Sequence, residues 1–107
     1  MKIVAKTRGV GLSFSSTEGG DYEVSVYVAS DGGSSGSGSA SVTVSWTDLY
    51  GSQSKTITLA VGSSGPYADG VTFPVSIVPS SGISSSASTG SLPPGAHFFY
   101  TTNVKDL

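Results

Sequence analysis

The sequence predicts an all-β protein: an antiparallel β-sandwich or jelly roll of about seven or eight short strands. Stretches of alternating apolar and polar residues recur at a spacing of about ten residues, and turns rich in Gly, Pro and Ser separate them. No segment combines helical periodicity with capping residues, so we expect little helix. The whole chain, residues 1–107, is expected to form a single domain.

The clearest strands lie between residues 40 and 61 and include the only tryptophan, Trp46. In both halves of this stretch, apolar residues alternate with hydroxyl residues, so each strand has one apolar face and one hydroxyl face. Residues 48–53 supply the turn, with Gly51 available for a positive φ. We therefore expect a hairpin whose inner face, centred on Trp46, forms the core of the sandwich. The expected core group is Val26, Val44, Trp46, Ile57, Leu59 and Phe73.

The N-terminal residues 1–20 are expected to form a strand and a loop, and are a candidate for attachment or assembly. Lys2, Val4, Lys6 and Arg8 alternate with less polar residues, which predicts a short edge strand whose charges discourage unwanted pairing. Residues 12–14 resume an extended pattern, and residues 15–20 form a turn cluster.

The next strand, residues 21–30, has an apolar face of Tyr and Val and a polar face that carries Tyr27. An aromatic residue on a polar face is either a binding residue or one that pairs across the sheet. The Gly- and Ser-rich residues 31–39 follow, and we expect a mobile loop at one end of the sandwich.

Three further strands are expected in the second half of the chain. Residues 62–70 form a loop that carries Tyr67, and residues 71–78 form a strand that Pro74 places near an edge or a bulge. A short strand is possible from Ile83 to Thr89. The last strand, residues 96–104, carries aromatic residues on both faces, so a second sheet, a loop or another subunit should cover each face.

Composition narrows the classes of function. The chain has no cysteine, a net charge of -2 and only 11% charged residues, whereas serine and glycine make up over a third of it. Thinly spread charge argues against binding to nucleic acid or to an anionic membrane. No apolar run approaches the ~20 residues of a membrane span, so we expect no insertion into a membrane. The start of the chain lacks the apolar core of a secretory signal, so we expect the protein to be made in the cytoplasm.

The sequence offers little catalytic chemistry. Its only histidine, His97, lies in the aromatic last strand, and no G-x-S-x-G motif is present. The carboxylates are scattered along the chain. Glu18 with Asp21, or Asp31, are candidates for binding calcium, but we expect these residues to lie in solvated turns instead. Glycoside hydrolysis by a pair of carboxylates is kept as an alternative, although so small a sandwich has little room for a cleft. We expect no enzyme activity, no cofactor and no metal.

One group of known proteins shares this succession of strands. The segments Y-E-V-S-V-Y-V (22–28) and V-T-V-S-W-T-D (42–48), a threonine-rich strand (56–58), a valine-rich strand after Gly70 and a final aromatic strand resemble small jelly-roll domains of tailed-phage structural proteins. These include head domains of tail fibres and receptor-binding proteins, and capsid-decorating sandwiches. The resemblance covers residues 21–107 and implies a virion surface protein that is made in the host cytoplasm.

The resemblance implies a homotrimer that contacts other virion proteins and adheres to a host surface glycan. A capsid-decorating or filament-forming protein is the alternative, and a free carbohydrate-binding module is the alternative from another class. We expect the face with His97 and Phe99 to form the subunit interface. Tyr50, Tyr67 and the loop 32–39, with Tyr27 as a further candidate, are expected to contact the glycan.

Overall fold

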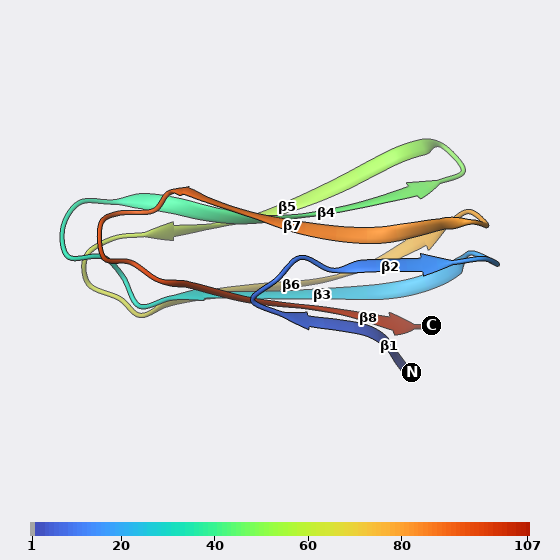
Figure 1. The fold of residues 1–107 in the computed structure, drawn as a ribbon, viewed down its shortest axis with the longest axis horizontal. Helices are drawn as coiled ribbons and strands as arrows, with labels where there is room; N and C mark the ends of the chain where they lie inside the picture. The colour runs from blue at the N-terminus through green and yellow to red at the C-terminus, as the bar shows by residue number, and fades with distance from the viewer. Residues whose placement is uncertain (1) are drawn as a thin grey trace.

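The computed structural model describes residues 2–107 and consists of eight β-strands in two antiparallel sheets (Figure 1). The predicted all-β sandwich is confirmed, and no residue between 2 and 107 is helical. The strands are β1 (Lys2–Arg8), β2 (Ser13–Ser16), β3 (Gly20–Ser30), β4 (Gly38–Asp48), β5 (Gly51–Val61), β6 (Tyr67–Ile77), β7 (Ser81–Ser91) and β8 (Phe98–Asp106).

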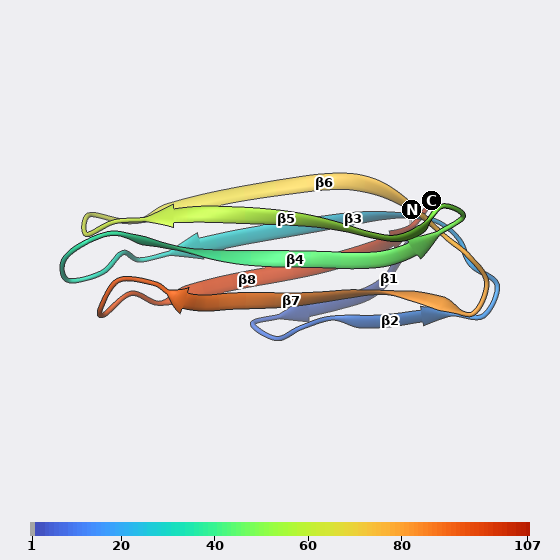
Figure 2. The same cartoon turned by 90° about the horizontal axis from the view of Figure 1, so that it is seen from above.

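The strand order is that of a jelly roll. Sheet A has the order β1-β8-β3-β6 and sheet B the order β2-β7-β4-β5. Apart from the β4–β5 hairpin, each strand is followed in sequence by a strand of the other sheet. The molecule measures 48 × 25 × 18 Å, with its strands along the long axis (Figure 2).

The core lies between the two sheets and consists mainly of valine. Alternating residues of β3 and β4 face inward, as predicted, and Val24, Val42 and Val104 are fully buried. Val26, Val44, Leu59 and Phe73 of the expected core group are buried as well. Small β-branched side chains suit this narrow space because they pack well on a pleated surface.

Two members of the expected core group, Trp46 and Ile57, are only half-buried, so the prediction that Trp46 is the centre of the core was wrong. Figure 1 shows the β4–β5 hairpin rising away from sheet A toward its tip, where Trp46 lies three residues before the turn. Trp46 contacts Phe73 across the gap, with 5.7 Å between ring centroids. Ile57 lies nearer the hairpin tip than Leu59 and Val61, which are buried on the same strand.

The hairpin turn is shorter than the predicted residues 48–53. Asp48 pairs with Gly51, so only Leu49 and Tyr50 lie in the turn. Gly51 has φ 114°, which confirms the expected use of its positive φ. The Tyr50 N–H donates to Asp48 Oδ1 at 2.8 Å, which holds the turn.

The first two strands belong to different sheets. β1 is an edge strand of sheet A, as predicted, but a bulge between Ile3 and Ala5 breaks its alternation. Val4 therefore packs toward the core and Ile3 is 49% exposed, the reverse of the expected faces. Residues 13–16, expected partly as loop, form the edge strand β2, and Leu12 before it is buried.

The length of β7 was underestimated more than that of any other strand. The sequence favoured a short strand from Ile83 to Thr89, but β7 spans 11 residues and lies inside sheet B, between β2 and β4. Only Ile83 and Ser85 of β7 are buried. A strand made almost entirely of serine gives no apolar alternation, so periodicity does not detect it.

A buried pair of hydroxyls joins the two sheets. Ser85 of β7 and Thr102 of β8 point at each other across the core, with 3.2 Å between their oxygens. Ser85 Oγ also accepts a hydrogen bond from the Leu12 N–H at 2.9 Å. These bonds satisfy polar groups that would otherwise be buried without partners.

Three loops meet at one end of the sandwich, on the left of Figure 1. The loop before β4, expected to be mobile, is tied to both neighbours: Gly33 N–H donates to Gly62 O at 2.9 Å, and Ser34 N–H donates to Pro94 O at 2.8 Å. A Cβ on Gly33 would lie 2.8 Å from Pro94 O. The glycines thus allow close packing of the loops here, at the end of the sandwich where this loop was expected.

Candidate functional site

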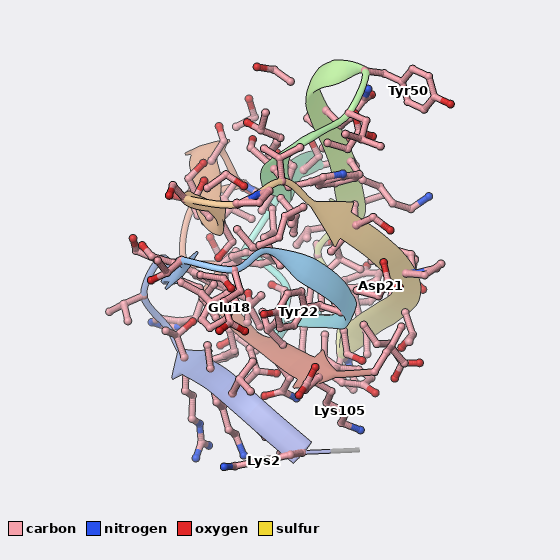
Figure 3. All side chains as sticks on the ribbon, turned by 90° about the vertical axis from the view of Figure 1, so that its right-hand side faces the viewer. Lys2, Glu18, Asp21, Tyr22, Tyr50 and Lys105 are labelled. Carbon is pink, nitrogen blue, oxygen red and sulfur yellow. The ribbon has the colours of Figure 1, made fainter. Side chains whose placement is uncertain are left out.

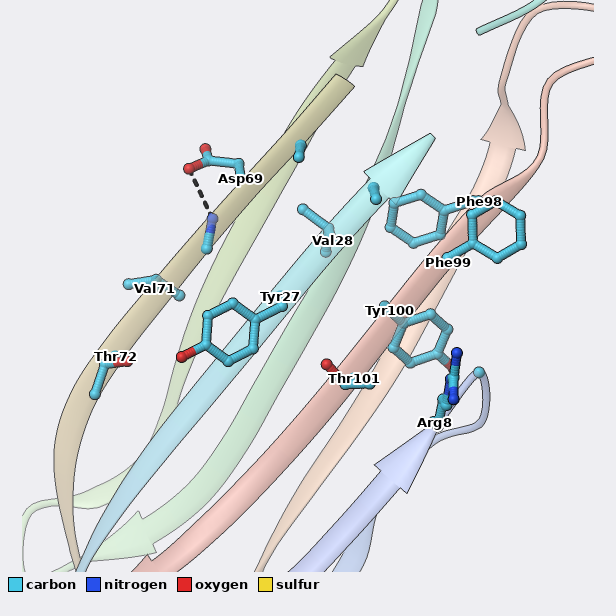
Figure 4. A pocket seen from close by; sticks show the side chains of 14 residues that line it. Arg8, Tyr27, Val28, Asp69, Val71, Thr72, Phe98, Phe99, Tyr100 and Thr101 are labelled. Carbon is cyan, nitrogen blue, oxygen red and sulfur yellow. Dashed lines mark hydrogen bonds between the residues drawn. The ribbon is translucent and has the colours of Figure 1, made fainter. Parts of the chain in front are cut away.

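A groove of about 740 Å³ lies on the outer face of sheet A. All of its lining residues belong to the four strands of that sheet or directly follow β1. The groove crosses the sheet from β1 over β8 and β3 to β6 (Figure 4). Its volume is in the range of about 300–1,000 Å³ that is usual for small-ligand sites.

Tyr27 forms the central wall of the groove. It lies on the outer face of β3, opposite Gly70 of β6 and Thr101 of β8. A Cβ on Gly70 would be 2.8 Å from the Tyr27 ring, so the ring lies over β6 only because position 70 is glycine. Tyr27 is 52% exposed and therefore presents an aromatic surface to solvent.

Phe99 forms the second aromatic wall. It is 58% exposed and pairs with Ala29, which in turn pairs with Ala68. The cross-strand row beside Phe99 therefore consists of Ala29 and Ala68, and the methyl side chains of these two residues form the floor of the groove. Exposed aromatic rings beside a floor of small residues leave room for a flat ligand.

Polar groups border the aromatic walls. Arg8 lies at the β1 end of the groove, in register with Thr101. On β6, the Thr72 hydroxyl is bonded to that of Ser25 at 3.0 Å. The groove therefore offers a guanidinium and several hydroxyls, which serve as hydrogen-bond donors and acceptors around an apolar centre.

His97 and Phe99, expected as an interface pair, are neighbours in the structure. Their rings stack with 6.5 Å between centroids. His97 is also tied to the loop before β4: its backbone N–H donates to Asp31 Oδ1 at 2.8 Å, and its Nδ1 lies 2.7 Å from Asp31 Oδ2. Both bonds lower the pKa of Asp31 below its ordinary value of 3.8. The bond from the His97 backbone N–H has the larger effect, and the bond to the His97 side chain has the smaller one.

The tyrosines expected to bind glycan do not form one surface. Tyr50 is 92% exposed at the tip of the β4–β5 hairpin, the end of the molecule that faces the viewer in Figure 3. Tyr67 is the first residue of β6 rather than part of a loop, is half-buried against the core, and lies at the opposite end with the loop 31–37. Tyr27 is the member of this group that lines the groove.

The outer face of sheet B is lined by hydroxyls. The successive rows across β7, β4 and β5 are Ser84–Ser45–Ser54, Ser86–Thr43–Thr56 and Ser88–Ser41–Thr58. The Thr43 and Thr56 hydroxyls are 2.9 Å apart. A smaller hollow of about 310 Å³ lies near Trp46 on this sheet.

Within residues 2–107, no three His, Cys, Asp or Glu side chains are placed to share a metal ion. The same range holds no helix long and apolar enough to cross a membrane. Comparison with protein-family models and with curated proteins finds no match to this chain.

Sequence reasoning identified both aromatic walls but not the groove. It assigned Tyr27 to a glycan and Phe99 to a subunit interface, because alternation places each on an outer face but says nothing of their separation. The floor residues Ala29, Ala68 and Gly70 gave no signal, since small residues are common in strands and turns. The missing information was the register between β3, β6 and β8.

Proposed function

We propose that this chain is a non-enzymatic structural protein on the surface of a tailed-phage particle, and that the groove of sheet A binds a glycan of the host envelope. The observation that carries the proposal is the exposed pair Tyr27 and Phe99 beside a floor of small residues. A sugar ring has an apolar C–H face that packs on an aromatic ring and a rim of hydroxyls that pair with polar groups. Arg8, Thr72 and Thr101 supply such groups around the walls.

The phage assignment is supported by the resemblance of residues 21–107 to phage jelly rolls and by the jelly-roll strand order. A particle carries many copies of a surface protein, so weak binding by each groove is amplified by multivalency. The resemblance implies a trimer. Because Phe99 is assigned to the groove, the subunit interface of that trimer must lie elsewhere, and the trimer would then present three grooves together.

Retention on immobilised bacterial surface polysaccharides tests the groove. The wild-type protein should be retained by at least one polysaccharide, and Tyr27→Ala and Phe99→Ala should each weaken retention. Tyr50→Ala is the matched control, because it removes an exposed tyrosine at the hairpin tip. Failure of the wild type to bind any polysaccharide, or an equal loss with Tyr50→Ala, would contradict the groove assignment.

Labelling of purified phage particles tests the location. Antibodies raised against the protein should decorate intact particles in electron micrographs, at the tail for a receptor-binding protein or over the head for a capsid-decorating one. Glycan binding without any particle labelling would instead favour the free carbohydrate-binding module.

A further inference from the structure

Thr101 lies at the open centre of the groove. On the outer face of sheet A, Thr101 pairs with Arg8 of β1 on one side and with Tyr27 of β3 on the other. Phe99 is two residues before Thr101 on β8 and therefore lies on the same face of the sheet. A guanidinium and two aromatic rings thus surround a residue with a short side chain, and all four residues line the groove.

The Tyr27 ring leaves the space above Thr101 free. The ring leans toward β6, where a Cβ on Gly70 would be only 2.8 Å from it. Figure 4 shows the ring on the β6 side of β3, whereas Arg8 lies beyond β8 at the opposite border of the groove. Neighbouring strands are about 4.8 Å apart, so the backbones of Arg8 and Tyr27 are about 10 Å apart. A ligand above Thr101 can therefore contact the ring and the guanidinium together.

Three of the five cations of the chain have a favourable neighbour within the fold. Lys2 is in register with Asp106, and Lys105 is in register with Glu23. Opposite charges that face each other across neighbouring strands attract each other. Lys55 lies over an aromatic ring, with its Nζ 5.5 Å from the ring centre.

The two remaining cations, Lys6 and Arg8, face uncharged residues. They pair with Asn103 and Thr101 of β8, respectively. Among residues 2–107, neither cation makes an ion pair with a carboxylate. Arg8 is exposed and, unlike Lys6, lines the groove. Its charge is therefore available to a ligand.

The acidic side chain of the groove lies at the opposite border. Asp69 of β6 is the only acidic residue among the described residues that line the groove, and its Oδ1 accepts a hydrogen bond from the Gly70 N–H at 2.8 Å. Strands β3 and β8 separate Asp69 from Arg8. The groove is thus positive at its β1 border and aromatic at its centre, so an anionic group of a ligand belongs at the β1 border.

We infer that the glycan bound in the groove is acidic and that Arg8 binds its carboxylate or phosphate group. This inference rests on the glycan-binding function proposed above. An arginine guanidinium matches the geometry of both oxyanions, because its planar fork donates two parallel N–H···O bonds. The acidic sugar then lies above Thr101, beside the rings of Tyr27 and Phe99.

Protection of the sheet edge is the other role that these cations can have. Charged side chains on an edge strand discourage pairing with other chains. This role requires only charge and applies to Lys6 and Arg8 alike, whereas binding of an acidic sugar requires a guanidinium at the groove. Lys6→Gln is therefore the matched control for Arg8→Gln, because each variant removes one positive charge from the outer face of β1.

The test uses bacterial surface polysaccharides in matched pairs. Each acidic polysaccharide is compared with a form whose carboxylates have been reduced to alcohols and with a form whose phosphates have been removed. The wild type should bind the native form about tenfold more tightly than the form that lacks the recognised group, the value of a hydrogen bond to a charged group. The separate treatments distinguish a carboxylate from a phosphate.

Four variants then assign the preference for the acidic form. Arg8→Gln should bind the native and the modified form equally, with the affinity that the wild type has for the modified form. Arg8→Lys keeps the charge without the fork and should retain only part of the preference. Lys6→Gln should keep the full preference, and Tyr27→Ala should weaken binding to both forms. All three positions are exposed, so the variants should fold, which their melting temperatures check.

The outcomes separate this inference from the proposed function. A wild type that binds both forms equally, or only neutral polysaccharides, while Tyr27→Ala weakens binding, would overturn the inference and leave the glycan-binding groove standing. An equal loss of preference in Lys6→Gln and Arg8→Gln would also overturn it, because the charge of the edge would then be responsible. Binding to no polysaccharide, or binding that Tyr27→Ala leaves unchanged, would overturn the proposed function itself and the inference with it.

Discussion

At the scale of single residues, Gly70 sets the position of Tyr27. Any side chain at position 70 meets the Tyr27 ring, because even a Cβ would be 2.8 Å from it. Gly70→Val should therefore push the ring away from β6 and lower glycan affinity about three- to tenfold, the value of one aromatic contact. Ala60→Val, which adds similar bulk on β5, should leave affinity unchanged in the same binding measurement. Equal affinities for Gly70→Val and wild type would show that the ring position does not matter.

The bond between Asp31 and His97 predicts a dependence of stability on pH. The pKa of Asp31 is lowered in the folded protein, so the carboxylate stabilises the fold above pH 3.8, and this contribution is lost as the pH falls through the lowered value. The melting temperature of Asp31→Asn should thus lie below that of the wild type at neutral pH, and the two should converge in acid. A difference that stays constant down to the lowest pH would argue against stabilisation by the ionised Asp31 carboxylate.

At the scale of strands, the buried hydroxyl pair predicts a coupled loss of stability. Ser85→Ala leaves the Leu12 N–H and the Thr102 hydroxyl without a partner and should cost about 1–3 kcal/mol in chemical denaturation. Adding Thr102→Val should cost less than the sum of the single changes, because it removes the unpaired hydroxyl. The exposed neighbour Ser84 is the control, and Ser84→Ala should change stability by no more than about 0.5 kcal/mol. Strict additivity would mean that the two hydroxyls do not interact.

How well each strand could be predicted depended on its apolar alternation. β3, β4 and β5 were predicted to within a few residues because valine, isoleucine and leucine recur on one face. β7 has the same length but is held by backbone hydrogen bonds to strands far away in the sequence, which leave no local pattern. The bulge in β1 likewise depends on its pairing with β8. Faces could be predicted where burial was one-sided, whereas pairing partners could be predicted only for the β4–β5 hairpin.

At the scale of the whole molecule, the candidate site arises from topology. Arg8, Tyr27, Gly70 and Phe99 lie on four different strands, and the order β1-β8-β3-β6 brings them together. Tyr50 and Tyr67 lie at opposite ends of the molecule because β5 runs along the sandwich between the turn that holds Tyr50 and the start of β6 at Tyr67. Composition and alternation predicted a sandwich with aromatic residues on its surface, but the choice between one binding surface and several required the register.

A nuclear magnetic resonance titration with oligosaccharides released from bacterial surface polysaccharides tests the glycan-binding groove most directly. Chemical-shift changes should cluster at Tyr27, Gly70, Phe99 and Thr101, saturate with oligosaccharide concentration, and disappear in Tyr27→Ala. Changes centred on Tyr50 or on the hydroxyl face of sheet B, with the groove resonances unmoved, would contradict the account.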